Sequence, residues 1–172
     1  YSLLSYQTAW LKTYYPAEFL AALLSSEIGN TDKVVQYINE ARELGCEILP
    51  PDVNESGFKF TVVADKRIRF GLGAVRNVGE GAIESIIAGR REGRYETLAD
   101  LVERIDLRLC NKRVVESLIA AGACDSLGGH RKQLLEALET ALQEALLKQA
   151  DRDAGQESVF GEMSALQHRT LL

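Results

Sequence analysis

The stretch from Phe70 to Ile87 places the strongest restriction on how this chain can fold. Its centre is Val78-Gly79-Glu80-Gly81, where two glycines stand one residue apart directly before an amphipathic run. The pattern predicts a short helix, a tight turn and a second helix. The apolar residues that would pack these pieces together are Leu72, Val75, Ala82, Ile83, Ile86 and Ile87.

The chemistry of this turn points to an anion. We expect the glycines at 79 and 81 to take backbone angles that other residues resist, and to leave amide N–H groups at the helix start uncovered. Such donors, at the positive end of a helix dipole, bind phosphate without a cationic side chain. By itself the motif is equally consistent with a turn that serves only packing, and Glu80 would oppose a phosphate unless its carboxylate points away.

Charge is unevenly distributed along the chain. The 172 residues carry a net charge of −5, which argues against a surface coated in DNA-binding charge. Residues 66–94, however, hold seven basic and three acidic groups, a local net of +4 that coincides with the glycine turn. This asymmetry indicates a local contact with nucleic acid.

The rest of the sequence predicts a mainly α fold with many helices, tandem helix–hairpin–helix motifs and one short antiparallel β-hairpin. Apolar spacing predicts helices over 1–13, 17–27, 32–44, 98–105, 112–121 and 130–150, with Thr31 and Thr97 as N-caps. Strand-like alternation over 58–63 and 67–70 predicts the hairpin. The two prolines of 46–54 favour a rigid, exposed, extended run, and we expect Tyr6 and Trp10 in the core.

The second turn, between the helices 98–105 and 112–121, repeats the layout of the first without its Gly-x-Gly. It carries Arg108, Asn111, Lys112 and Arg113. Alone, these residues are typical of a capped helix start with a solvated basic edge. As the second half of a tandem, they would grip the backbone of the other strand, independently of sequence.

Residues 151–155 are polar and predict a flexible linker, and the tail 156–172 shows no sustained period. Within the tail, Gln156-Glu157-Ser158-Val159-Phe160 combines a glutamine with an aliphatic–Phe pair, which is typical of a short ligand for a hydrophobic pocket.

No catalytic constellation is visible in the sequence. His130 and His168 lie in polar surroundings, no paired carboxylates suggest a two-metal site, and Asp52 fits a turn better than a ligand role. The three cysteines lack metal-ligand spacing, which indicates buried thiols in a reducing compartment. A chain that starts at Tyr1, with Met163 as its single methionine, suggests a piece of a larger protein.

Taken together, several separate motifs resemble the alpha subunits of bacterial replicative DNA polymerase III, in one colinear order over about residues 1–160. The resemblance rests on the runs at 1–12 (YSLLSYQTAWLK), 15–24 (YPAEFLAALL), 49–56 (LPPDVNES), 68–75 (IRFGLGAV), 111–113 (NKR) and 121–128 (AGACDSLG).

This resemblance implies three parts. Residues 1–55 would end the fingers region, residues 56–150 would form the tandem helix–hairpin–helix module that holds duplex DNA, and residues 151–172 would carry a linker with the sliding-clamp motif. The implied DNA-binding residues are Arg76, Asn77, Val78, Gly79, Gly81, Arg108, Asn111, Lys112 and Arg113. The implied clamp-binding residues are Gln156, Ser158, Val159 and Phe160.

The family's catalytic aspartates lie outside this chain, so we expect no cofactor here, with Mg²⁺ at the absent palm site, and no polymerase activity from the chain alone. The implied partners are duplex DNA, the sliding clamp and other replisome subunits in the bacterial cytoplasm, with no membrane. Two alternatives stay open: a helical protein-interaction module, and a DNA-repair helix–hairpin–helix domain, which would not account for residues 1–55.

Overall fold

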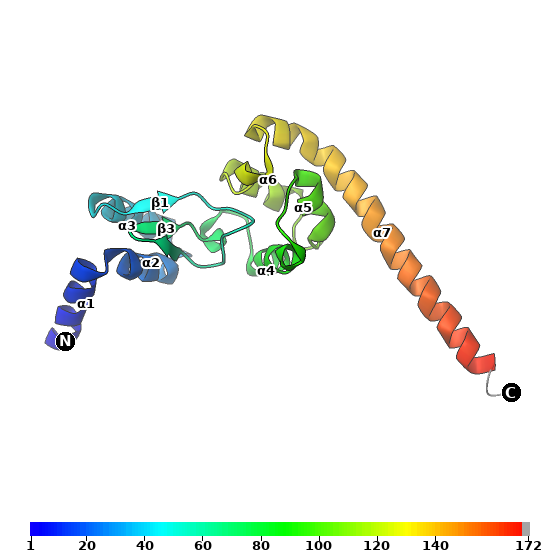
Figure 1. Cartoon of the computed structure of the whole chain (residues 1–172), viewed down its shortest axis with the longest axis horizontal. Helices are drawn as coiled ribbons and strands as arrows, with labels where there is room; N and C mark the ends of the chain where they lie inside the picture. The colour runs from blue at the N-terminus through cyan, green and yellow to red at the C-terminus, as the bar shows by residue number, and fades with distance from the viewer. Residues whose placement is uncertain (170–172) are drawn as a thin grey trace.

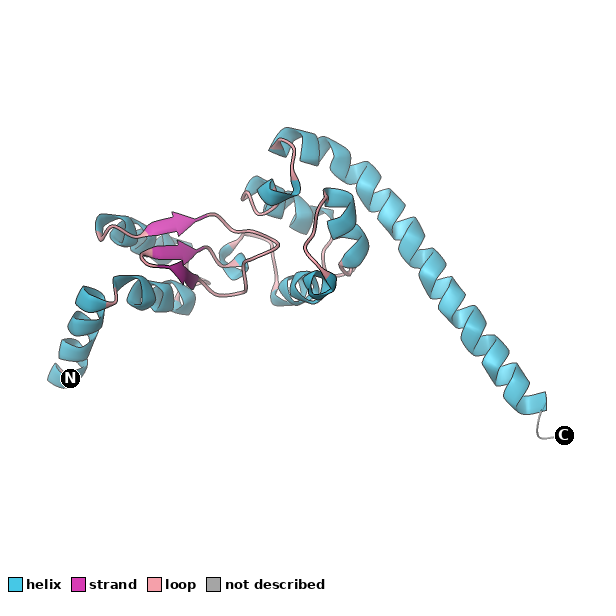
Figure 2. Ribbon diagram, in the orientation of Figure 1, coloured by secondary structure: helices cyan, strands magenta, loops and turns pink. Residues whose placement is uncertain are grey.

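The computed structural model describes the backbone of residues 1–169 and the side chains of residues 1–155. Over these residues the fold is mainly helical with one small sheet, as the sequence predicts (Figures 1 and 2). The α-helices are α1 (Ser2–Tyr14), α2 (Pro16–Ser26), α3 (Thr31–Glu43), α4 (Glu80–Gly89), α5 (Leu98–Arg104), α6 (Lys112–Ala120) and α7 (Arg131–Arg169). The strands are β1 (Glu47–Leu49), β2 (Thr61–Ala64) and β3 (Arg67–Arg69), and single 3₁₀ turns are η1 (Leu72–Ala74), η2 (Arg90–Glu92) and η3 (Asp125–Leu127).

Local signals set most helix boundaries. Pro16 opens α2 at the position where its missing N–H costs nothing. The Thr97 side chain accepts a hydrogen bond from Asp100 N and caps α5, as predicted. Helix α3 is capped one residue earlier than predicted, because the Asn30 side chain accepts from Lys33 N and places Thr31 inside the helix.

The sheet has the order β1-β3-β2. The predicted hairpin is confirmed, since β2 and β3 pair antiparallel with Val62 opposite Ile68. Strand β1 was missed: it pairs parallel to β3, with Ile48 opposite Ile68. The prolines at 50 and 51 follow this strand and leave residues 47–49 free to pair. The predicted exposure of the run is also wrong, because Pro51 and Val53 are buried.

The apolar side chains gather into two clusters. One joins α2, α3 and the sheet, and includes Leu20, Leu24 and Ile68. The other joins α4, α5, α6 and α7, and includes Ile86, Leu118 and Leu138. We call the first part, residues 2–49 and 58–69, the sheet unit, and the second, residues 72–150, the helical unit; they lie next to each other in Figure 1.

Helix α1 contradicts the core prediction for its aromatic residues. It buries none of its side chains, and Tyr6 and Trp10 are 68% and 43% exposed. The reason is position: α1 lies at one end of the molecule, where it packs on α2 and pairs Lys12 with Glu40 of α3 (Figure 1). Val35, Leu44, Leu135 and Leu146, which belong to the apolar spacing of the helices predicted over 32–44 and 130–150, are also exposed.

Helix α7 departs most from the predicted secondary structure. Its first part packs on α5 and α6, and the helix then continues away from them (Figure 1). Residues 151–155, predicted as a flexible linker, are helical. These residues contain no proline, and one glycine, Gly155, weakens a helix by only about 1 kcal/mol.

Candidate nucleic-acid interface

The glycine turn has a different backbone from the one the sequence predicts. Its first arm is the single 3₁₀ turn η1, not a full helix. The left-handed conformation falls on Asn77, whose φ is +65°, while Gly79 has an ordinary extended backbone with φ −82°. Asparagine tolerates this region because its short polar side chain can hydrogen-bond locally. Gly81 lies inside α4 and is not among the residues with positive φ. The unusual backbone angles predicted for Gly79 and Gly81 are therefore wrong.

Gly79 matters instead because no side chain caps the start of α4. It occupies the N-cap position, where no side chain accepts a hydrogen bond from the helix, and a Cβ built on it would meet no atom within 4 Å. The first N–H of α4 with a backbone partner is that of Ile83, which donates to Gly79 O. Within the described residues, the N–H groups of residues 79–82 are therefore unpaired donors at the positive end of a helix dipole.

The two hairpins meet at this turn. Asn77 Nδ2 donates to Ser117 Oγ of α6 at 3.1 Å. Arg113 lies one helical turn before Ser117 and is exposed, as is Arg76 beside Asn77. Neither arginine forms an ion pair or side-chain hydrogen bond with the described residues. The arrangement places the uncovered donors near a surface with two free cations.

Most polar side chains of the second hairpin already have partners within the protein. Asn111 accepts from Val114 N at 3.1 Å and caps α6. Arg108 binds Asp106, and this side-chain hydrogen bond holds the pKa of the Asp106 carboxyl below its ordinary value. Lys112 binds Glu139 of α7 at 2.8 Å and lowers the pKa of that carboxyl in the same way. Of the four predicted residues, Arg113 alone has a charge without a partner among the described residues.

The basic block of residues 66–94 is not one surface. Arg67 pairs with Glu47, and Arg69 and Arg94 both pair with Glu55. Arg90 donates to the carbonyl oxygens of Val53 and Ser56. Most of the +4 block therefore supports the fold, and at the glycine turn Arg76 has no ion-pair partner within the described part of the chain.

The far end of α4 is anchored by Tyr95 and Arg104. The buried Tyr95 hydroxyl donates to Ile86 O at 2.7 Å, and the Arg104 guanidinium lies 4.3 Å from the centre of the Tyr95 ring. Arg104 Nη2 also donates to Gly89 O at 3.0 Å. These bonds satisfy carbonyls at the C-terminus of α4 and so fix the direction in which its free N-terminus points.

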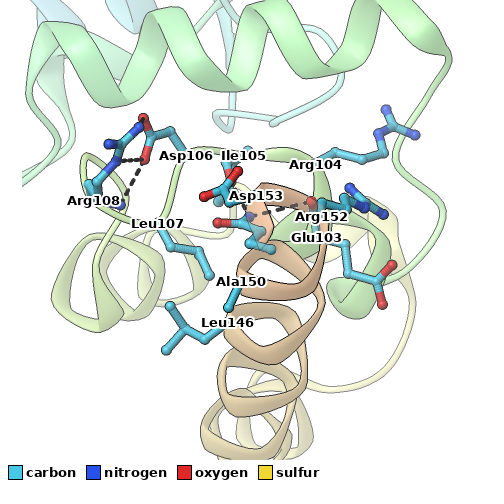
Figure 3. Close-up of a pocket in the computed structure, with 11 residues that line it drawn as sticks. Glu103, Arg104, Ile105, Asp106, Leu107, Arg108, Leu146, Ala150, Arg152 and Asp153 are labelled. Carbon is cyan, nitrogen blue, oxygen red and sulfur yellow. Dashed lines mark hydrogen bonds and ion pairs between the residues drawn. The ribbon is translucent and has the colours of Figure 1, made fainter. Parts of the chain in front are cut away.

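A pocket opens between the second hairpin and α7 (Figure 3). Gln149 of α7 donates to Ile105 O at 2.9 Å, and Lys148 pairs with Glu103. The charged side chains around the pocket balance in sign: Glu103, Asp106 and Asp153 against Arg104, Arg108 and Arg152. The contacts around the pocket hold α7 against the hairpin. The pocket itself has no excess positive charge that would attract an anion.

Other expectations have simple outcomes. Asp52 is a turn residue, since its Oδ1 accepts from Asn54 N at 2.7 Å, and all three cysteines are buried and free. Among the described residues, no group of three or more His, Cys, Asp or Glu side chains could hold a metal ion, and no helix is long and apolar enough to cross a bilayer. The side chains of Gln156, Ser158, Val159 and Phe160 lie outside the described residues.

Sequence reasoning missed three partners of the interface. Asp106 could have been found, because it stands two residues before Arg108 in the turn. Ser117 and Glu139 reach Asn77 and Lys112 from 40 and 27 residues away, and no local pattern reveals such pairs.

Comparison with known proteins agrees with this geometry. A family model described as a helix–hairpin–helix motif matches residues 45–134, which run from the sheet through both hairpins to the start of α7. The fold and this match define the class of the chain as a helix–hairpin–helix protein.

The relatives are more specific. The chain is 46% identical to the DNA polymerase III subunit alpha of Pseudomonas aeruginosa over 96% of its length, 44% identical to that of Vibrio cholerae over 95%, and 45% identical to that of Escherichia coli over 95%. It therefore belongs to the DNA polymerase III alpha-subunit family. The chain spans only 14–15% of the length of these relatives. Because these matches cover 95–96% of the chain, they include nearly all of residues 1–55, which a repair domain would not explain.

Proposed function

We propose that this chain is the duplex-binding segment of the alpha subunit of a bacterial replicative DNA polymerase. The observation that carries the proposal is the uncovered N-terminus of α4, where the N–H groups of residues 79–82 have no partner among the described residues. A backbone phosphate would accept these hydrogen bonds and gain from the helix dipole. The family match and the name of the relatives support the assignment to DNA.

Binding of this kind reads the backbone and not the bases. Gly79 and Gly81 would present the donors, and Arg76 and Arg113 would add charge beside them. The Val78 N–H already donates to Val75 O, so Val78 would contribute by packing under the turn. Asn77 would hold the turn against α6. Contacts to phosphate position a protein on the duplex without selecting a sequence, which suits a polymerase that must hold any product.

The second hairpin would contribute less than the first. Arg108 and Lys112 would have to leave Asp106 and Glu139 to reach a phosphate, and exposed ion pairs of this type contribute little to stability because water screens them. The two side chains would therefore exchange their carboxylates for a phosphate at little cost in free energy. Asn111 would still cap α6 through its bond with Val114 N. We expect Arg113 to be the strongest contact of this hairpin.

DNA synthesis itself is proposed for the whole subunit. The residues described here would contribute by holding the duplex, while the catalytic aspartates and their Mg²⁺ would belong to other parts of the subunit. A cytoplasmic location and contacts with other replisome subunits follow from the same assignment.

We also propose that Gln156, Ser158, Val159 and Phe160 dock on the sliding clamp. The support is the sequence pattern and its place directly after the helical unit. Phe160→Ala in the complete chain should abolish capture by immobilised clamp, whereas Met163→Ala, in the same stretch but outside the motif, should not. Undiminished capture of Phe160→Ala would reassign the motif.

The test of duplex binding is its dependence on salt. The logarithm of the association constant should fall linearly with the logarithm of salt concentration, with a slope of about −0.9 for each phosphate contacted. Arg113→Ala should reduce the magnitude of the slope by about 1. Lys33→Ala, an exposed lysine on α3, is the matched control and should leave it unchanged. A slope near zero for the parent chain contradicts the proposal.

A further inference from the structure

The segment from Asp52 to Ser56 makes more contacts than a turn needs. Ser56 is fully buried, and no other polar or charged residue among those described is buried. Its Oγ accepts from Asp52 N and donates to Phe70 O, both at 2.9 Å. This side chain therefore closes the turn and at the same time fastens it to the residue that follows β3.

The same turn reaches into the helical unit. Val53 N donates to Ala123 O at 2.9 Å, and the Val53 side chain is fully buried in the cluster of the helical unit. Asn54 pairs with the Tyr95 backbone in both directions: its Oδ1 accepts from Tyr95 N at 2.7 Å, and its Nδ2 donates to Tyr95 O at 3.0 Å. A side-chain amide can form such a pair only with a backbone held in a fixed orientation.

Ser126 completes the arrangement. Its Oγ donates to Asp52 Oδ1 at 3.0 Å and accepts from Asn54 Nδ2 at 3.3 Å. Ser126 itself lies on the surface of the helical unit. It therefore links the first and third residues of the turn to η3 without filling any part of the core.

Packing alone connects the two units weakly. Among the described residues, Phe70 packs against both apolar clusters, Ala74 of the helical unit packs against the cluster of the sheet unit, and Gly73 N donates to Phe58 O at 3.0 Å. With so small a shared core, the default expectation is that the units move relative to each other. The polar contacts of Asp52–Ser56 add to these few links, since Ser56 Oγ bonds Phe70 O itself, and they oppose such motion.

We propose that Asp52–Ser56, with Ser126, is a clasp that fixes the angle between the sheet unit and the helical unit, and that Asn54, Ser56 and Ser126 are positioning residues for the DNA-binding hairpin. β3 runs through Phe70 and η1 directly into the turn at Asn77, so the clasp also sets where residues 79–82 point relative to the sheet. Only this consequence for DNA rests on the proposed function.

The experiment measures the distance between the units directly. Thr61→Cys on β2 and Thr140→Cys on α7 are both exposed and would carry spin labels. The native cysteines are buried, so the introduced thiols would be labelled selectively. Pulsed electron spin resonance on the complete chain, without DNA, should give one narrow distance distribution. Ser126→Ala should widen it at least twofold, and Ser126→Thr, which keeps the hydroxyl, should restore it.

Ser56→Ala is the stronger variant, but it alters a buried site and could unfold the chain. If Ser56→Ala unfolds, Asn54→Ala and Ser126→Ala, the latter at an exposed position, show whether loss of the clasp widens the distance distribution. Ser26→Ala, an exposed hydroxyl bonded only within α2, is the matched control and should leave the distribution narrow. An unchanged distribution in folded Ser126→Ala and Asn54→Ala would overturn the clasp.

Duplex titrations of the same variants separate the two proposals. We expect a loss of duplex affinity of about threefold to tenfold in Ser126→Ala. A widened distribution with unchanged duplex affinity would confirm the clasp and refute its role in positioning the hairpin. A parent chain with a narrow distribution and no salt-dependent binding would refute the proposed function and leave the clasp standing.

Discussion

Asn77 and Ser117 join the two hairpins through one hydrogen bond of 3.1 Å, and Asn77 makes it from a left-handed backbone. The residue that bends the turn is thus also the one that holds it against α6. Its two tasks can be separated by substitution.

Asn77→Ala should lower the free energy of unfolding by about 1–2 kcal/mol, because alanine is strained at φ +65° and cannot bind Ser117. Asn77→Gly should cost less, since glycine accepts the conformation and loses only the hydrogen bond. Ser117→Ala, which removes the bond without strain, is the reference. Urea denaturation checks the order; equal losses in Asn77→Ala and Asn77→Gly would show that strain is unimportant.

Gly79→Asp should change stability and DNA binding in opposite directions. The position is open and has an ordinary backbone, and aspartate is a good N-cap, so α4 should gain a few tenths of a kcal/mol. The same carboxylate would occupy the donors and repel phosphate, so duplex affinity should fall at least tenfold. Thermal denaturation and a duplex titration measure the two effects.

Gly29→Asp is the matched control for that experiment. It adds the same charge at another open glycine, between α2 and α3. Its duplex affinity should stay within about twofold of the parent. Equal weakening by both variants would mean that net charge, not the start of α4, governs binding.

Gly89→Ala should destabilise the chain by about 1–3 kcal/mol, because a Cβ there would overlap the Tyr95 hydroxyl. Tyr95→Phe removes that hydroxyl and should cost about 1 kcal/mol through the lost bond to Ile86 O. The double variant should be more stable than the sum of the two losses predicts. Strict additivity in urea denaturation would show that the overlap is relieved elsewhere. Gly57→Ala, where a Cβ meets nothing, is the control.

Stability should fall at alkaline pH. Burial raises the pKa of the Cys110 thiol to about 11 and that of Cys124 to about 12, from an ordinary value of 9.0. Between pH 9 and 11 the unfolded chain therefore loses protons that the folded chain keeps, and the free energy of unfolding drops by up to about 1.4 kcal/mol per pH unit for each thiol. Urea denaturation as a function of pH measures this slope of the free energy of unfolding. Cys110→Ala should reduce the slope by the contribution of one thiol.

The sequence predicted the elements whose signals are local. Pro16, Thr97 and the apolar spacing of α6 placed their helices, and the glycine motif placed the turn that opens α4. It failed where distant contacts decide. Asn77, not a glycine, takes the left-handed backbone because Ser117 of α6 receives its side chain, and β1 forms because β3 supplies an edge. The charge block failed for the same reason, since Glu55 binds two of its arginines.

The path of the chain between β1 and β2 has a consequence for how this architecture can be cut and recombined. The chain leaves the sheet at Leu49, buries Val53 in the helical unit and returns to the sheet at Thr61. The two units are therefore interleaved in sequence although they are separate in packing. A single crossover before Val53 would place it on a different parent from β1. A single crossover after Val53, up to residue 60, would place it on a different parent from the helical unit whose core holds it. Exchange between homologues should succeed only when residues 47–127 are inherited as one block.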